Sequence, residues 1–341
     1  MTTIPEVVRE SAASRIIQDH GYPLLYRGKV GELFEVPDKP DQLLMMRSDR
    51  LSIFDFVLPC EVERKGEVLT ALTHYWLTQV FPDVPNHLLA WGMNEDLWAK
   101  AGWNMGDVQL LPLERTLLVR RSEVWPYEMI YRAHLGGSVW KDYETTDKVA
   151  GVELPSGLKK WQKLTLPIFT PTTKAEDGHD EKLTLDEYPE ETRDSNGATP
   201  SGRCFNIYHR AYDHALTKSI VILDTKFEVS PDGRLLDEVL TPDSSRFTTP
   251  EDLEAAIAEG RDPIFYDKEP IRIWGRKIGT PWGVGINKLD PSNYEHCEFV
   301  ASLQIPFDVV DEASARYLDI GQRLTLLQLD KYQLIEMMIS D

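Results

Sequence analysis

Charged side chains alternate along an apolar segment in the second half of the chain. Asp224, Lys226 and Glu228 stand two residues apart, and Asp237 follows after a turn-forming Ser-Pro-Asp-Gly. Residues two apart in a β-strand point to one face of the sheet, so an acid–base–acid face would lie beside Asp237 on the next strand. Buried charges are costly unless they pair or bind a metal, and carboxylates with phosphate oxygens suit Mg²⁺. The apolar residues before Asp224 favour a central strand with a metal site over a solvated face with a salt bridge.

A lysine flanked by glycines forms a second candidate. The run Tyr-Arg-Gly-Lys-Val-Gly at positions 26–31 places Lys29 directly after Gly28. Glycine lets the backbone approach a ligand closely, and a lysine there can meet a phosphate. A hairpin glycine with a solvated lysine is the alternative, because short patterns of this kind are weak on their own.

Three further segments combine hydrogen-bond donors with cations. Arg132 and Ser138 enclose two glycines, which can expose amides and a hydroxyl to an anion. The turn Thr241–Arg246 can grip a carboxylate or phosphate, although an ordinary Asp/Ser turn is equally compatible. The loop Thr170–Asp180 gathers donors, Lys174 and acids, and binding groups often lie in such loops. Together these segments predict an ATP–Mg²⁺ cleft next to a site for an anionic substrate.

The net charge narrows the range of partners. The 341 residues include 37 Lys and Arg against 56 Asp and Glu, a formal net charge of −19. An acidic surface of this size repels phosphate backbones and anionic lipids, so neither nucleic acid nor a membrane is an expected partner. A few cations inside a cleft can still bind a small anionic substrate.

The cysteine spacing and the absence of common motifs argue against several kinds of site. The three cysteines are far apart and include no CxxC pair, which argues against a zinc site and a disulfide framework and suits a reducing cytoplasm. No apolar run approaches the ~20 residues of a membrane span, and the first residues do not read as a signal peptide. GxxxxGK[ST], GxGxxG, HExxH and GxSxG are absent, so a nucleotide would be bound without a P-loop.

The first 120 residues or so are expected to be rich in strands, with a helix across them. An initial surface helix is predicted over Ile4–Gln18, and a second helix over Gly66–Val80, where apolar residues recur at helical spacing. Four short apolar segments read as strands: Leu24–Val36, Gln42–Arg47, Arg115–Arg121 and Glu128–Leu135.

The remaining residues mix loops, strands and helices. Residues 145–196 show no lasting periodicity and are predicted to be mainly loop. A helix is expected from Thr249 as N-cap and Pro250 at the first turn to Gly260. The other predicted elements are a helix over Phe205–Lys218, strands over Ser219–Val229 and Arg234–Val239, and a last helix over Val309–Leu329. The chain therefore reads as one α+β unit with two lobes.

These segments occur in an order that resembles a known family. The matching stretches are YRGKV, SDRLSIFDFVLP, RKGEVLT, EMIYRAHLGGSVW, LPIFTPTTKAEDGHDE, LDTKFEV, DEVLTPDSSRF, YDKEPIRIW and VVDEASARYLDIGQRLT. They span about Tyr26 to Thr325 and resemble the phosphoribosylaminoimidazole-succinocarboxamide synthase (SAICAR synthetase) family. The combination of DTKFE, DEVLTPDSSRF and TPTTKAEDGHD is highly specific.

The resemblance implies an enzyme of de novo purine biosynthesis. The family joins the carboxylate of carboxyaminoimidazole ribonucleotide (CAIR) to L-aspartate with ATP, giving SAICAR, ADP and phosphate, and an acyl-phosphate route is implied. The implied fold is α+β and two-lobed, similar to the protein-kinase and ATP-grasp architectures. Residues 1–120 would form a smaller β-rich lobe that covers ATP. Residues 121–341 would form a larger lobe with the substrate and metal sites, the C-terminal helix and a family-atypical insertion near 275–305.

The resemblance also assigns roles to individual residues. Lys29 and Lys226 would contact the ATP phosphates beside Gly28, and the segment Glu128–Met129 would border adenine. Glu228 and Asp237 would hold Mg²⁺. The residues implied to bind substrate are Arg132, Ser138 and Arg246 for the CAIR phosphate; Lys174, Asp180, Asp243 and Ser244 around it; and Arg50, Ser52 and Asp55 near CAIR and aspartate. The catalytic side chains would be Lys29, Lys226 and Arg246, and a homo-oligomer is compatible with this reading.

Some residues depart from the family pattern. Gly31-Glu32 stand where members often have Arg-Asp, which removes one cation near the phosphates, and Asp186–Arg203 is more polar than usual. Two alternatives therefore stay open. One is a related ligase with a different amine or carboxylate substrate, and the other is a nucleotide-binding protein without activity. The presence of both lysines and both metal carboxylates favours the active ligase.

Overall fold

The computed structural model describes residues 10–174, 181–189, 191, 193 and 197–340. The chain divides into two compact units. Unit 1 comprises Met1–Tyr75, His87–Arg121 and Asp267–Asp341, and unit 2 comprises Trp76–Asn86 and Ser122–Tyr266. In this division Asp267–Asp341 groups with the N-terminal residues, whereas the sequence reading placed it in the larger lobe. Which lobe covers ATP and which binds substrate stays a prediction.

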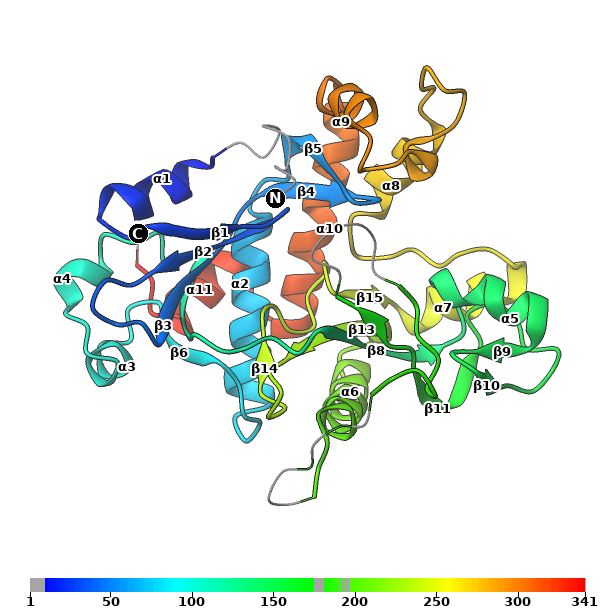
Figure 1. The fold of residues 1–341 in the computed structure, drawn as a ribbon, viewed down its shortest axis with the longest axis horizontal. Coiled ribbons are helices and arrows are strands. Elements are labelled where there is room, and N and C mark those ends of the chain that lie inside the picture. The colour runs from blue at the N-terminus through cyan, green and yellow to red at the C-terminus, as the bar shows by residue number, and fades with distance from the viewer. Residues whose placement is uncertain (1–9, 175–180, 190, 192, 194–196, 341) are drawn as a thin grey trace. The chain divides into compact units, whose positions relative to one another are not determined.

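Unit 1 is built on a five-stranded antiparallel sheet (Figure 1). Its strands, in spatial order, are β1 (Leu24–Arg27), β2 (Gly31–Glu35), β3 (Gln42–Arg47), β7 (Thr116–Arg120) and β6 (Leu88–Trp91). Every residue of β3 is buried, because both faces of the sheet are covered. Leu44 and Met46 pack in one cluster with side chains from three short helices, α1 (Ala12–Asp19), α3 (Glu95–Lys100) and α4 (Met105–Val108). Leu43 and Met45 belong to a second cluster with β7.

The remaining elements of unit 1 surround helix α2 (Lys65–Tyr75), which contacts β3. Helix α10 (Phe307–Thr325) packs against α2 and against α8 (Glu269–Lys277), and α11 (Leu329–Ile335) also contacts α2. The other elements are the hairpin β4 (Arg50–Ile53) and β5 (Phe56–Glu61), a 3-10 turn at Ile286–Lys288, and α9 (Tyr294–Ala301), which contacts β5. The segment predicted as an insertion thus contains the end of α8, this turn and α9.

Three sequence expectations for unit 1 need correction. The single strand predicted over Leu24–Val36 is two strands, because the chain turns at Gly28, whose N–H donates to the carbonyl of Gly31 over 2.8 Å. The regular helix predicted to Val80 ends at Tyr75, and a π-helix covers Trp76–Val80. The last helix ends at Thr325 and not at Leu329, because Leu326 takes a left-handed conformation (φ 62°). The first residues of the predicted helix Ile4–Gln18 lie outside the described residues.

Unit 2 is built on a six-stranded antiparallel sheet centred on β8 (Tyr127–His134) and β13 (Val221–Val229). The other strands are β11 (Lys163–Phe169) and β12 (Thr172–Thr173), which pair with β8, and β14 (Leu235–Leu236) and β15 (Ser245–Thr248), which pair with β13. Helix α6 (Pro200–Leu216) packs on β13, β8 and β11 (Figure 1). The smaller elements are a 3-10 turn at Gly137–Val139, α5 (Trp140–Thr146), β9 (Lys148–Val149), β10 (Val152–Glu153) and α7 (Pro250–Glu259).

Local residue types explain where unit 2 agrees with the sequence reading and where it differs. Helix α7 begins and ends as predicted: Thr249 accepts the N–H of Asp252 over 3.2 Å, and Gly260 closes the helix with φ 71°. The strand predicted over Arg234–Val239 shrinks to two residues, because Asp237 turns the backbone to φ 57°. Helix α6 starts five residues earlier than expected, with Pro200 in its first turn. Among the described residues, no helix combines the length and apolarity that crossing a membrane requires.

Candidate active site

One face of β13 carries the charged residues that the sequence singled out. Asp224, Lys226 and Glu228 alternate with Thr225 and Phe227, which are each 1% exposed. In the register of the sheet, Asp224 is paired with Arg132 on β8 and with Arg246 on β15. The expected shared face is therefore present, and neighbouring strands add charges to it that no spacing within β13 could show.

A cationic group, here called the arginine cluster, occupies one end of this face. Arg246 Nη1 lies 2.6 Å from Asp224 Oδ2, and Arg132 Nη1 contacts the same oxygen. Arg132 also donates to Thr170 Oγ1 over 3.1 Å and to Ser138 Oγ over 3.4 Å. Burial, together with the charge of Arg246, lowers the pKa of the Arg132 guanidinium, while Asp224 opposes this shift. Two guanidinium groups share one carboxylate, so the cluster keeps a net positive charge.

The Gly136–Ser138 loop lies against the arginine cluster. Gly137 has φ +64°, and a Cβ built on it would lie 2.9 Å from Nη1 of Arg246. The Ser138 carbonyl accepts a hydrogen bond of 2.9 Å from Lys182, which also pairs with Asp142. The structure thus brings together Arg132, Ser138 and Arg246, which were predicted to share an anion site.

An acidic group occupies the other end of the face, and is called the acidic cluster. Lys226 Nζ lies 2.6 Å from Glu128 Oε1 on β8 and 4.0 Å from Glu228 Oε1. Lys174 pairs with the other oxygen of Glu228, and Asp237 acts on Glu228 electrostatically from the residue after β14. Three carboxylates face two ammonium groups here, so the net charge is negative.

The electrostatics of the acidic cluster suit a divalent cation. Burial and the charge of Asp237 raise the pKa of Glu228 above its ordinary value, although Lys174 and Lys226 oppose the shift. Burial disfavours the charged form of Lys226, but Glu128, Glu228 and Asp237 outweigh it and raise the pKa of Lys226.

Two carboxylates that repel each other fit a cation between them. Within the described ranges no group of three or more His, Cys, Asp or Glu side chains is placed to hold a metal. Mg²⁺ commonly takes one or two carboxylates and completes its shell with phosphate oxygens and water. Glu228 and Asp237 therefore fit Mg²⁺ in the company of a nucleotide.

The predicted site residues of unit 1 lie around the turn between β1 and β2. Lys29 Nζ is 2.6 Å from Asp55 Oδ1, and both side chains are about half exposed. Arg50 is buried, and its guanidinium donates to Glu32 Oε1 over 2.6 Å and to the Gly28 carbonyl over 3.1 Å. Arg50 thus supports the turn that carries Lys29, and the substrate contact predicted for it stays a prediction.

Comparison with known proteins settles the family. A sequence model described as SAICAR synthetase matches residues 24–288. This chain belongs to the SAICAR synthetase family. The phosphoribosylaminoimidazole-succinocarboxamide synthase of Polaromonas naphthalenivorans is 37% identical over 335 residues, covering 95% of this chain and 100% of the relative. That of Leptothrix cholodnii is 38% identical over 316 residues, covering 90% and 97%.

Solved structures agree with the SAICAR synthetase assignment. The SAICAR synthase of Saccharomyces cerevisiae, solved in complex with SAICAR, has a TM-score of 0.69 at 30% identity and covers 90% of this chain and 96% of its own. A SAICAR synthetase solved with ADP has a TM-score of 0.56 at 17% identity over 90% and 99%, which shows the fold. The predicted family and the α+β fold class are confirmed.

The other residues that the SAICAR synthetase resemblance implied are placed as follows. Ser244 accepts the N–H of Thr241 over 3.1 Å, and its carbonyl accepts the N–H of Lys226 over 2.9 Å, so the turn that also holds Asp243 borders the charged face. The Met129 side chain is fully buried, so the segment Glu128–Met129 would border a nucleotide through Glu128 or the backbone. Ser52 is partly exposed on β4, and Asp180 lies outside the described residues.

Sequence reasoning missed two members of the arginine cluster. Asp224 was grouped with the metal-binding face, but the register places it between two arginines. Thr170 was noted only as part of a loop, and it accepts from Arg132. A sheet register is needed to find either role, because both depend on contacts between distant parts of the chain.

Proposed function

We propose that this chain joins CAIR to L-aspartate with ATP, giving SAICAR, ADP and phosphate, through an acyl-phosphate intermediate. Membership of the SAICAR synthetase family supports the reaction, and the yeast relative bound to SAICAR supports the class of ligand. The observation that carries the proposal is the pair of oppositely charged clusters on one face of one sheet.

The arginine cluster would bind the phosphate of CAIR. Arg246 keeps 27% of its side chain exposed, so its guanidinium can reach a ligand while it is held by Asp224. Arg132 is almost fully buried and orients Ser138. Charge-assisted hydrogen bonds from guanidinium groups are strong and directional, which suits a phosphate monoester.

The acidic cluster would receive the triphosphate of ATP with its metal. Glu228 and Asp237 would hold Mg²⁺, which when bound supplies positive charge that offsets the repulsion between the phosphates and the CAIR carboxylate. Lys226, fixed by Glu128, would contact a phosphate oxygen. Lys174 already pairs with Glu228, so it would share that carboxylate or turn to the substrate.

The order of bond changes follows from the weakness of a carboxylate as an electrophile. Attack of the CAIR carboxylate on the γ-phosphate would release ADP and turn a carboxylate oxygen into part of a leaving group. The amine of aspartate would then form the amide bond and release phosphate. Two anions meet in the first step, so fixed cations such as Lys226 and Arg246 would lower its barrier.

In unit 1, Lys29 is our proposed phosphate-binding residue. Lys29 would contact the ATP phosphates, with Gly28 allowing the close approach, and Arg50 would hold the turn in place. Ser52 and Asp55 would lie near CAIR and aspartate. All three cysteines are free, which supports our proposal of a cytoplasmic location.

An omission experiment tests the reaction. The protein is mixed with ATP, Mg²⁺, CAIR and L-aspartate, and ADP release is measured with each component left out in turn. The proposal expects ADP only when CAIR is present, and SAICAR only when aspartate is added. ADP release without CAIR would refute the substrate assignment, as would equally fast turnover with alanine or glutamate in place of aspartate.

A further inference from the structure

The Gly136–Ser138 loop is held from two sides. A Cβ built on Gly136 would lie 2.2 Å from Cε3 of Trp161, so the indole rests directly on the backbone there. The backbone of Gly136 is extended (φ −164°), a conformation open to any residue, so glycine is required here for space. Arg246 lies against Gly137 next to it. The loop therefore sits between an aromatic ring and a guanidinium group of the arginine cluster.

The indole of Trp161 is fixed in position. Its N–H donates to Asp262 Oδ1 over 2.7 Å, and its ring meets the ring of Phe265 in an edge-to-face contact with centroids 5.3 Å apart. Only 2% of Trp161 is exposed. A ring that is buried and anchored at its polar edge gives the loop a rigid surface to rest on.

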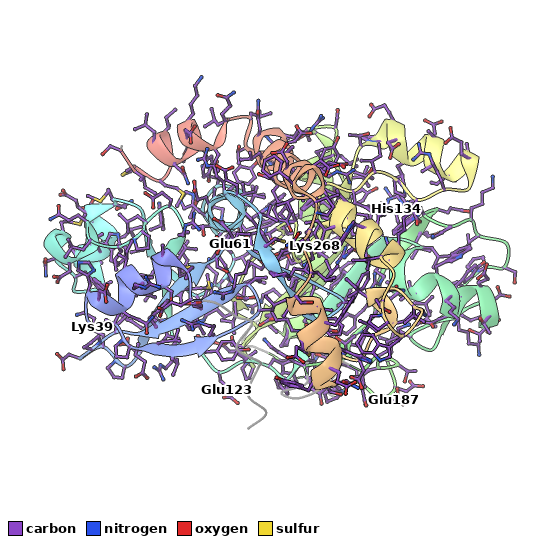
Figure 2. The ribbon with its side chains drawn as sticks, turned by 90° about the horizontal axis from the view of Figure 1, so that it is seen from above. Lys39, Glu61, Glu123, His134, Glu187 and Lys268 are labelled. Carbon is purple, nitrogen blue, oxygen red and sulfur yellow. The ribbon has the colours of Figure 1, made fainter. Side chains whose placement is uncertain are left out.

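The backbone of Trp161 is held in an unusual conformation. Its φ of +66° is rare for a bulky residue and persists only where the surroundings impose it. Its N–H donates to the Leu135 carbonyl over 2.7 Å. Its own carbonyl accepts a hydrogen bond of 2.9 Å from Nδ1 of His134 (labelled in Figure 2), the last residue of β8. Both hydrogen bonds tie Trp161 to the two residues that precede the loop.

We propose that Trp161 is a positioning residue for the phosphate subsite of the arginine cluster. Its indole holds Gly136–Ser138 so that the loop amides and the Ser138 hydroxyl meet the same anion as Arg246. The inference rests on the proposed function, because the anion is the phosphate of CAIR. Trp161 acts through the loop, so its loss should weaken the use of CAIR and leave the use of ATP almost unchanged.

The first test compares Trp161→Ala with Lys160→Ala. Lys160 pairs with the same Asp262 carboxylate over 2.6 Å, so its removal perturbs the anchor and leaves the ring under the loop. Trp161→Ala should raise the KM for CAIR about tenfold, with less than a twofold change in kcat and in the KM for ATP. Lys160→Ala should change none of the three. An equal rise in the KM values of ATP and CAIR would overturn the proposal.

The second test is a double-mutant cycle with Gly136→Ala. The added methyl group collides with the indole, so this variant should also raise the KM for CAIR about tenfold or more. Trp161→Ala opens the space that the methyl group needs, so the double variant should be no worse than Gly136→Ala alone. If the two effects multiply instead, the residues do not act on each other and the proposal fails.

The results for the wild type and for the variants distinguish a failure of the proposed function from a failure of the role of Trp161. A wild-type protein that releases no ADP with CAIR overturns the proposed function, and the ligand of this inference falls with it. A wild-type protein that uses CAIR, with effects that multiply in the cycle, overturns the role of Trp161 alone. If Trp161→Ala does not fold, Trp161→Leu takes its place in the same cycle, because it also removes the ring over Gly136.

Discussion

The arginine cluster and the acidic cluster share the strands β8 and β13 but have opposite net charges. Asp224 stands between two arginines, whereas Glu228 stands between lysines and a further carboxylate. The two acids are four residues apart on the same face of one strand. Their surroundings differ because the neighbouring strands place different residues beside each acid.

This contrast would allow one strand to bind two ligands of opposite charge. A carboxylate that is outnumbered by guanidinium groups orients them and leaves positive charge for an anion. A carboxylate with a second carboxylate nearby keeps negative charge for a cation, and burial together with that neighbouring charge raises the pKa of Glu228. The same residue type thus acts as an orienting group at one end and as a candidate metal ligand at the other.

Neutralising the acidic cluster should reduce the activity more than any other change considered. Glu228→Gln should lower kcat/KM for Mg²⁺·ATP on the order of 1,000-fold, about 4 kcal/mol, because it removes a carboxylate that we propose binds the metal. The raised pKa of Glu228 means that its ionised form is less favoured in the folded chain than in the unfolded one. The variant should therefore be no less stable than the wild type at pH 7, as measured by thermal unfolding.

A matched control for this variant is Glu123→Gln, which changes an exposed acid of the same unit. It should leave both turnover and melting temperature unchanged. Near-normal turnover of Glu228→Gln at limiting Mg²⁺ would remove the metal role, and with it the contrast between the two clusters.

Removing one guanidinium tests the other end of the face. Arg246→Met should raise the KM for CAIR about 100-fold, because a charge-assisted hydrogen bond in a partly buried site contributes about 2–3 kcal/mol. The KM for ATP should change much less. Arg210→Met removes an exposed pair with Asp83 in the same unit and should affect neither value. A larger effect on ATP than on CAIR would reverse the assignment of the two clusters.

Acid should destabilise the folded chain through His134, which follows Arg132 by two residues on β8. Burial, aided by Lys163, lowers the pKa of His134 to about 4 from 6.5. The unfolded chain takes up a proton below pH 6.5 that the folded chain refuses, so stability falls as the pH drops from 6.5 to 4, by on the order of 3 kcal/mol.

His134→Gln should therefore show a smaller loss of stability than the wild type between pH 7 and pH 4, measured by urea unfolding. His74→Gln in unit 1 provides a comparison, because burial lowers the pKa of His74 to about 3 and predicts the same direction. An unchanged acid loss in His134→Gln would show that this histidine is not held neutral beside the arginine cluster.

The smallest expected effect concerns Lys29. Its pair with Asp55 is about half exposed, so Lys29→Met should change the free energy of unfolding by no more than about 0.5 kcal/mol. The KM for ATP should nevertheless rise about tenfold if Lys29 contacts the phosphates. An unchanged KM for ATP would confine phosphate binding to Lys226 and leave the acidic cluster as the nucleotide site.

Local sequence signals predicted the parts of the fold that depend on neighbouring residues. The capped helix α7 was predicted to the residue, because Thr249, Pro250 and Gly260 each act within one turn. The shared face of β13 followed from the two-residue period. The strand over Arg234–Val239 was overestimated, since a non-glycine residue with positive φ such as Asp237 leaves no clear trace in the sequence.

Contacts between distant segments limited the prediction of the site. The family resemblance implied one role, phosphate binding, for Arg132, Ser138 and Arg246, and the structure places these three residues together. The position of Asp224 between the arginines required the register of three strands. The role of Arg50 as a support for the β1–β2 turn depends on its buried contact with Glu32, which lies on β2, whereas Arg50 lies on β4. Trp161 lies in a loop without any motif, so its contact with Gly136 could not be predicted from the sequence.

The extended backbone of β13 also sets a length. Asp224 and Glu228 are four residues apart, and at about 3.3 Å per residue they lie about 13 Å from each other along the strand. Under the proposed function, the CAIR phosphate would bind at one end of this length and the metal-bound phosphates of ATP at the other. The strand would therefore set how far the CAIR carboxylate must extend from its own phosphate to meet the γ-phosphate.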